Sequence, residues 1–207
     1  MVKKQGRKEE TRRRMLQAAS QSFRSHGFVG IGVDGIARMA GVTSGAFYAH
    51  FGSKEAAFNV ALDVGLEEVI EGIPKFQRDF GGQWTKAFAD YYLGQSHREN
   101  LACGCALTTL SPEVVRASSQ THAAFEEKIG KIADLIAAGL DQGSGEERRA
   151  RAWAMLGILI GGLTIARAVQ TSKASEEISA AIRTAAVQAA GVARKIYPQK
   201  SVVKEKK

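Results

Sequence analysis

Residues 33–51, VDGIARMAGVTSGAFYAHF, constrain the fold more than any other segment of this chain. The first apolar side chains in it share one face of a helix, and these are Ile36, Ala37 and Ala40. Gly41 follows them and can adopt the left-handed conformation that ends a helix, because glycine has no Cβ. The hydroxyl of Thr43 or Ser44 can then cap a second helix. The segment therefore predicts two short helices joined by a tight turn.

The second of these helices has an apolar side and a polar side. Phe47 and Phe51 lie four residues apart, so they share a face, which we expect to be buried. Ser44, Tyr48 and His50 lie on the opposite face, and their polar groups are of the kind that bind phosphates and base edges. This arrangement is typical of a helix-turn-helix, whose second helix enters the major groove of DNA.

The same pattern resembles a known family. The matching positions are Ala18-Ala19, Phe23, Gly27-Phe28, Ile36-Ala37, Ala40-Gly41-Val42, Gly45, Phe47-Tyr48, His50-Phe51 and Lys54. On these residues the chain resembles the TetR/AcrR family of bacterial one-component repressors over roughly its first quarter. It departs from the family at Gly32, where Ser or Thr is usual as a helix cap. It also carries Gly35 inside the first helix of the motif, where glycine costs about 1 kcal/mol relative to alanine.

The resemblance implies an all-α fold with a helix-turn-helix DNA-binding domain at residues 1–53. A larger helical domain for effector binding and dimerisation follows at residues 54–198, and residues 199–207 form a basic tail that we expect to be disordered. The residues themselves also favour helices, because no segment shows sustained strand alternation. Outside the motif, helices are expected at residues 8–26, 54–72, 83–98, 120–141, 146–170 and 175–196, with residues 101–118 interrupted by Pro112.

Positive charge is concentrated at the two ends of the chain. Its net charge is +8, and residues 1–54 hold ten Lys and Arg against three Asp and Glu. Residues 200–207 hold four basic side chains against one acidic, whereas the segment between is nearly neutral. A basic module attached to a neutral body is typical of a protein that binds a polyanion. The same charges would also suit a basic scaffold that coats DNA without sequence preference, or a surface that is merely soluble.

Carried over residue by residue, the family pattern assigns roles on the DNA. Ser44 and Ala46 are candidates for base edges, Ala46 only through a thymine methyl group. The expected phosphate contacts are Thr43, Tyr48, His50 and Lys54. Gly45 permits a close approach to the DNA backbone, and Arg12 and Arg13 add a salt-sensitive attraction. Alternatively, Tyr48 is a packing aromatic and His50 a solvated surface group.

A ligand cavity is a weaker prediction. Aromatic and aliphatic residues of the body helices lie at spacings that could line one: Trp84, Phe88, Tyr91, Tyr92, Leu107, Trp153, Leu156 and Ile160. Such walls suit a small apolar ligand. The same residues would also make an ordinary helical core, and only the family's habit of keeping a cavity there favours the ligand.

Cys103 and Cys105, separated by one glycine, resemble the cysteines of a subgroup that senses electrophiles or oxidants. A thiolate at a helix start can be stabilised by the partial positive charge of the helix N-terminus. Two near thiols could also trap an oxidised cysteine as a mixed or intersubunit disulfide. Alternatively, both are small packing residues.

Other chemistry is poorly supported. Residues 30–35 spell G-x-G-x-x-G, but an amphipathic helix precedes them where a dinucleotide site needs a strand. No histidine pair or second cysteine cluster suggests a metal, and we expect neither a cofactor nor enzymatic activity. The apolar stretch at residues 152–166 is shorter than the ~20 residues that cross a bilayer, and no secretion signal is recognisable, so we expect a cytoplasmic protein.

The expected function is therefore that of a ligand- or stress-responsive repressor on a palindromic operator. The resemblance implies a homodimer formed through the last two helices. The sequence itself shows only two apolar helices that must be buried, and intramolecular packing would satisfy that equally well.

Overall fold

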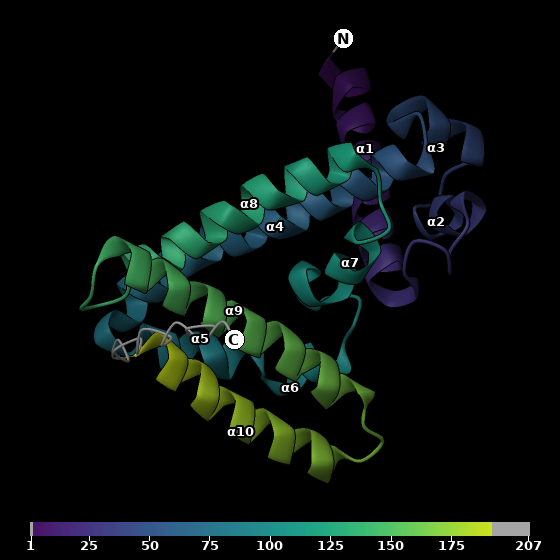
Figure 1. The fold of residues 1–207 in the computed structure, drawn as a ribbon. Coiled ribbons are helices and arrows are strands. Elements are labelled where there is room, and N and C mark those ends of the chain that lie inside the picture. Colours follow the sequence, from purple (N-terminus) through teal and green to yellow (C-terminus); the bar gives the residue numbers. More distant parts are fainter. Residues whose placement is uncertain (1, 192–207) are drawn as a thin grey trace, which may run out of the picture.

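A computed structural model describes residues 2–191, and over this range the chain is helical throughout, with no strand (Figure 1). The fold class expected from the sequence is thereby confirmed. The first elements are α1 Val2–His26, α2 Val33–Met39, α3 Ser44–Phe51, α4 Lys54–Phe80 and a 3₁₀ turn, η1 Gly81–Gln83. The rest are α5 Trp84–Tyr92, α6 Gln95–Glu99, α7 Ala106–Val114, α8 Ser119–Ala138, α9 Gly145–Ala168 and α10 Ser172–Ala190.

Helices α1 to α3 form a small head at one end of the molecule (Figure 1). Its core consists of side chains from all three helices, namely Met15, Ala19, Phe23, Ile36, Ala37 and Phe47, all at most 1% exposed. Gly41 has φ +66° and ends the α2 segment, as its position in the sequence predicts. The N-cap of α2 is Gly32, which makes no side-chain cap, so this departure from the family pattern does remove a hydrogen bond.

Helix α4 connects the head to the body, running from α3 to η1 alongside α8 (Figure 1). The sequence predicts its end near residue 72, but the helix continues through Pro74 to Phe80. A proline inside a helix costs about 3 kcal/mol, because one hydrogen bond is lost and the ring clashes. The buried side chains of Ile70 and Ile73 and the half-buried Phe76 offset this cost by packing against the body.

Two other predicted segments have different boundaries. The helix expected at residues 83–98 is two helices, α5 and α6, separated at Leu93 and Gly94. Pro112 does not interrupt the next segment, because it lies inside α7. Leu110 and Val114 on either side of it are buried, so tertiary packing again outweighs the lost hydrogen bond.

Helices α8, α9 and α10 complete the body, and α9 and α10 pack along each other (Figure 1). Ser144 and Glu147 form a capping box that starts α9. Alone among the described helices, α9 is long and apolar enough to cross a membrane by length and composition. Its position between α8 and α10 makes it the central helix of the body instead. The expected end of the last helix at residue 196 and the tail at 199–207 lie outside the described residues.

Candidate nucleic-acid interface and effector cavity

Local interactions fix where α3 begins and which way it faces. The Thr43 hydroxyl accepts a hydrogen bond from the Ala46 N–H at 3.2 Å and caps the helix, as expected. Phe47 is fully buried, with its ring centroid 4.9 Å from that of the half-buried Phe51. Because these two rings hold one side of α3 in the head, the other side is directed to solvent.

The solvent side of α3 carries the expected DNA-contacting residues. Gly45 is exposed, Tyr48 is 51% exposed, and Ala46 and His50 are half-buried. The ring of Tyr48 also makes an edge-to-face contact with Phe47 at 5.8 Å between centroids. The ring of Tyr48 therefore packs on the core while half of its surface is exposed, and its contact with a phosphate stays a prediction.

Ser44 and Lys54, also expected to contact DNA, interact with other elements of the head. Ser44 donates a hydrogen bond to the Asp34 carboxylate and so ties the start of α3 to α2. The Lys54 ammonium lies 4.6 Å from the centre of the Phe28 ring, a cation–π contact that holds the first turn of α4 against the head. No local pattern in the sequence points to Asp34, because the pair depends on how α2 and α3 cross.

Arg12 and Arg13 of α1 lie on the surface of the head. Arg12 is accessible to solvent, and Arg13 pairs with Glu10 at 2.8 Å one turn earlier. The hydrogen bond from Arg13 lowers the pKa of Glu10. Since both members of this pair are largely exposed, it contributes little to stability, and Arg13 remains able to exchange Glu10 for a phosphate.

The G-x-G-x-x-G sequence is a turn between helices. Residues 27–32 link α1 to α2 and include Gly30 and Gly32, whereas Gly35 lies inside α2. A Cβ on Gly30 would lie 2.1 Å from the backbone oxygen of His26, so the tight turn itself requires glycine. No strand flanks the motif within residues 2–191, and the helix–strand unit that a dinucleotide site needs does not form there.

A cavity of about 140 Å³ lies where α4, α5 and the segment before α7 meet. It brings together three of the expected pocket residues, Phe88, Tyr91 and Tyr92, with both cysteines. The remainder of its wall is Gly65, Glu68, Val69, Gly72, Phe76, His97, Gly104 and Ala106. The pocket prediction thus includes one aromatic wall but neither the contribution of α4 nor the two cysteines, which the sequence assigns to a separate thiol sensor.

The other expected pocket residues lie elsewhere. Leu107 and Leu156 are fully buried in the core, and Ile160 is half-buried. Trp153 is 38% exposed and its ring lies 5.7 Å from the Arg149 guanidinium, on a side of α9 that does not face the cavity. These four belong to the core and the surface of the body.

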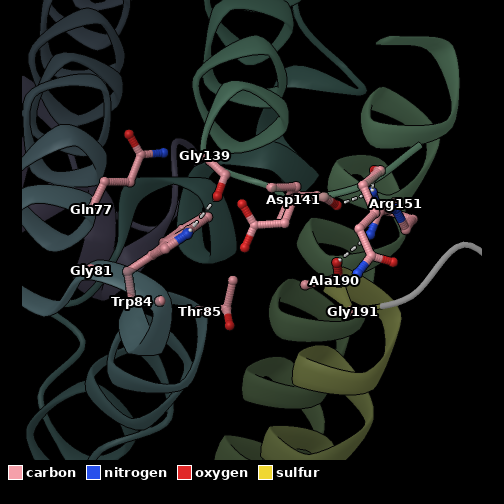
Figure 2. Close-up of a pocket in the computed structure, with 12 residues that line it drawn as sticks. Gln77, Gly81, Trp84, Thr85, Gly139, Asp141, Arg151, Ala190 and Gly191 are labelled. Carbon is pink, nitrogen blue, oxygen red and sulfur yellow. Dashed lines mark hydrogen bonds between the residues drawn. The ribbon is translucent and has the colours of Figure 1, made fainter. Parts of the chain in front are cut away.

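Trp84 lines a second, wider pocket of about 460 Å³ at the far end of the body, shown in Figure 2. Its indole N–H donates to the Gly139 carbonyl at 2.9 Å. Across this pocket Arg151 donates to the carbonyls of Asp141 and Ala190, both at 2.9 Å. These side chains satisfy carbonyl groups at the ends of α8 and α10, so their evident role is to close the end of the bundle.

The two cysteines have different surroundings. Cys103 is exposed, and its backbone N–H donates to the side-chain oxygen of Asn100 at 3.1 Å. Cys105 is the N-cap residue of α7, and burial raises the pKa of its thiol. The hydrogen bond with Tyr92 and the first N–H groups of α7 lower that pKa, but they do not compensate for burial. The start of α7 therefore does stabilise the Cys105 thiolate, as expected, but burial has the larger effect on the pKa.

Sequence reasoning misses two residues beside the cavity. The His97 ring nitrogen Nδ1 lies 2.9 Å from the Tyr91 carbonyl, and burial lowers the pKa of this histidine. Arg167 of α9 donates through Nε to the His97 carbonyl at 2.8 Å. Because this contact joins residues 70 positions apart, no local pattern could have revealed it.

Comparisons with known proteins agree with this geometry. Residues 15–61 match the model for bacterial regulatory proteins of the tetR family. The HTH-type transcriptional repressor NemR of Escherichia coli (strain K12) is 26% identical over 137 residues, which cover 65% of this chain and 69% of NemR. No group of three or more metal-binding side chains exists among the described residues.

Solved structures share the fold. The reduced form of E. coli NemR has a TM-score of 0.70 at 21% identity, over 84% of this chain and 95% of that one. A TetR-family regulator from Agrobacterium tumefaciens reaches 0.72 at 16% identity, over 86% and 97%. AibR, solved with isovaleryl coenzyme A and operator DNA, reaches 0.61 at 14% identity, over 84% and 96%. The tetR-family model on residues 15–61, the similarity to NemR and the shared fold together support a TetR-family transcriptional regulator.

Proposed function

We propose that this protein is a dimeric, cytoplasmic repressor that binds a palindromic operator and is released by a small molecule or a reactive electrophile or oxidant. The observation that carries the proposal is the capped helix α3, whose exposed face lies on a basic head. NemR is a repressor by its name, and AibR was solved with both operator DNA and a ligand. Each subunit would place α3 in one half-site.

Contacts between the head and the body supply a route for release. Arg24 of α1 pairs with Glu68 of α4 at 3.0 Å. A Cβ on Gly65 of α4 would lie 2.4 Å from that of Ala106, so α4 and α7 touch at this point. Glu68, Gly65 and Ala106 also line the smaller cavity. A ligand there would displace α4 relative to α1 and change the spacing of the two heads, and docking on two half-sites tolerates little change.

The experiment that tests the proposal is selection of bound fragments from sheared genomic DNA at about 0.15 M salt, where weak electrostatic binding is suppressed. An inverted repeat shared by the bound fragments is the expected result. Enrichment without a shared motif would contradict it and favour a scaffold that coats DNA without sequence preference. The basic head of residues 1–54 is the feature that keeps this second candidate open.

The proposed dimer interface is the outer face of α9 and α10. Exposed residues on this face of α9 are small or apolar apart from one hydroxyl, which donates to the Ile160 carbonyl: Ala150, Trp153, Ala154, Gly157, Thr164, Ile165 and Ala168. A monomer rarely leaves such a surface to water, and small residues allow a second copy's helices to approach closely. The predicted alternative, burial within one chain, accounts for the other side of α9, which already packs on α8 and α10.

Gly157→Glu is expected to convert the dimer to a monomer. A Cβ at this position meets nothing within 4 Å, so the change is free of clashes inside one chain. In a dimer it would bury an unpaired carboxylate, which costs several kcal/mol. Sedimentation velocity would measure the change in mass. Gly130→Glu on α8, where the atom nearest to an added Cβ is 3.8 Å away, is the matched control and should stay dimeric. A dimeric Gly157→Glu protein would contradict the interface.

Replacing each cysteine by serine tests the proposed thiol sensor. Cys103→Ser should greatly reduce the rate of alkylation by N-ethylmaleimide, because Cys103 is exposed whereas burial raises the pKa of the Cys105 thiol and so disfavours its reactive thiolate. If the protein senses electrophiles, Cys105→Ser or Cys103→Ser should abolish their effect on operator binding and leave the basal affinity unchanged. A full response in the double variant would show that the cysteines are packing residues.

A further inference from the structure

The smaller cavity has the dimensions and walls of a site for one aromatic ring. Its volume is about 140 Å³, and a protein cavity of roughly 150 Å³ holds benzene. Phe76 and Phe88 meet edge to face at 5.5 Å between centroids, and Phe76 lies 5.3 Å from Tyr91. Tyr91 is 57% exposed, so it stands at the mouth. A flat ring entering past Tyr91 would contact aromatic surfaces on several sides.

Positive charge lies behind the part of the cavity wall that contains His97 and Gly104. Arg167 lies behind Gly104, because a Cβ on that glycine would be 2.2 Å from Nη2 of the arginine. Arg167 is hydrogen-bonded to the His97 carbonyl, and within residues 2–191 it has no ion pair with a carboxylate. A half-buried guanidinium without a counter-ion is costly to desolvate, so a ligand anion beside it would be stabilised.

A second arginine strengthens this field. The Arg24 side chain is only 7% exposed, and its Nε is buried without a hydrogen-bond partner. Its Nη2 would lie 2.8 Å from a Cβ on Gly65, another residue of the cavity wall. Glu68 is the one carboxylate in the wall, and it already pairs with Arg24 from a 59% exposed position. Arg24, Arg167 and Glu68 together carry a net charge of +1, which an anionic ligand would neutralise.

We infer that this cavity binds a monocyclic aromatic carboxylate, with its ring among Phe76, Phe88 and Tyr91 and its carboxylate directed to Arg167. This inference names the effector class for the site that the proposed function already requires. Guanidinium and carboxylate are well matched for paired hydrogen bonds, and an aromatic wall provides the apolar contact. Tyr92 is a further residue of the wall, and its hydroxyl pairs with that of Thr108 at 2.8 Å.

The test is isothermal titration calorimetry of the full chain without DNA, using benzoate and its neutral isostere benzamide. Benzoate should bind on the order of tenfold more tightly or better, the usual effect of a charge-assisted hydrogen bond. Arg167→Gln should remove this preference while benzamide binding persists. Arg149→Gln, an exposed arginine of the same helix, should retain it. Equal binding of the two compounds, or an unchanged preference in Arg167→Gln, would overturn the inference.

A second variant keeps the test decisive if Arg167→Gln fails to fold. Gly72 lines the cavity and a Cβ on it would meet nothing within 4 Å, so Gly72→Leu can extend into the open space. Replacing a helical glycine also favours the helix, and the melting temperature should not fall. Gly72→Leu should abolish benzoate binding, and undiminished binding would place the ligand elsewhere and refute the site.

Operator binding distinguishes this inference from the proposed function. Benzoate that binds and also releases the operator supports both. If benzoate does not bind although another compound releases the operator, the inference fails and the proposed function stands. If benzoate binds in the cavity without releasing an otherwise specific operator, the ligand class stands and the role of this cavity in release fails.

Discussion

Replacing Gly45 by glutamate is expected to weaken operator binding by about 100-fold or more without reducing the melting temperature. Gly45 is exposed in the first turn of α3, and the nearest atom to an added Cβ is the Thr43 hydroxyl oxygen at 3.8 Å. A carboxylate at a helix start interacts favourably with the helix dipole, so the folded head tolerates it. In the complex a glutamate at this position would place its carboxylate against DNA phosphates, and such a pair of like charges costs several kcal/mol. Because each 1.4 kcal/mol changes the affinity tenfold, a loss of about 100-fold or more follows.

The measurement is fluorescence anisotropy on the selected operator, repeated over a range of salt concentrations. Gly130→Glu carries the same change of residue and charge on α8 of the body and should bind the operator as the native protein does. Gly45→Ala separates size from charge, since a methyl group tests only how closely α3 approaches the DNA. If Gly45→Glu binds as tightly as Gly130→Glu, then α3 does not face the DNA.

The elements that could be predicted from the sequence are those decided by neighbouring residues. Thr43 as a cap and Gly41 at positive φ follow from side-chain chemistry within a few positions. Pro74 and Pro112 mislead the prediction of helix ends, because a proline removes a single hydrogen bond and the burial of its neighbours can outweigh that loss. Helix ends of this kind depend on packing partners that are distant in sequence.

The cavity is only partly predictable for a related reason. Between residues 152 and 166 helix α9 is apolar nearly all round, so its sequence does not say which side faces a cavity, the core or a second subunit. Trp153, Leu156 and Ile160 therefore have the spacing of pocket-lining residues, although Trp153 lies on the outer face of the helix. The positive charge beside the cavity comes from Arg24 on α1 and Arg167 on α9, and only the folded arrangement brings them to the same site.

Phe47→Ala is expected to lower the free energy of unfolding of the head by about 3–5 kcal/mol, the usual cost of removing a buried phenylalanine. The ring is fully buried and contacts Phe51 and Tyr48, so its loss leaves α3 without its main attachment.

Because α3 is short and depends on tertiary packing for its helicity, the same change should abolish operator binding. Amide hydrogen exchange would show the loss of protection in α1 to α3, and urea unfolding would give its size. The control is Phe80→Ala, because the Phe80 ring is 51% exposed. Among the aromatic residues that the structure describes it stacks only on Phe76, with 5.7 Å between the ring centroids. It should cost about 1 kcal/mol or less and leave operator binding intact. If the head of Phe47→Ala were as protected as that of Phe80→Ala, this ring would not be what orients the DNA-facing side of α3.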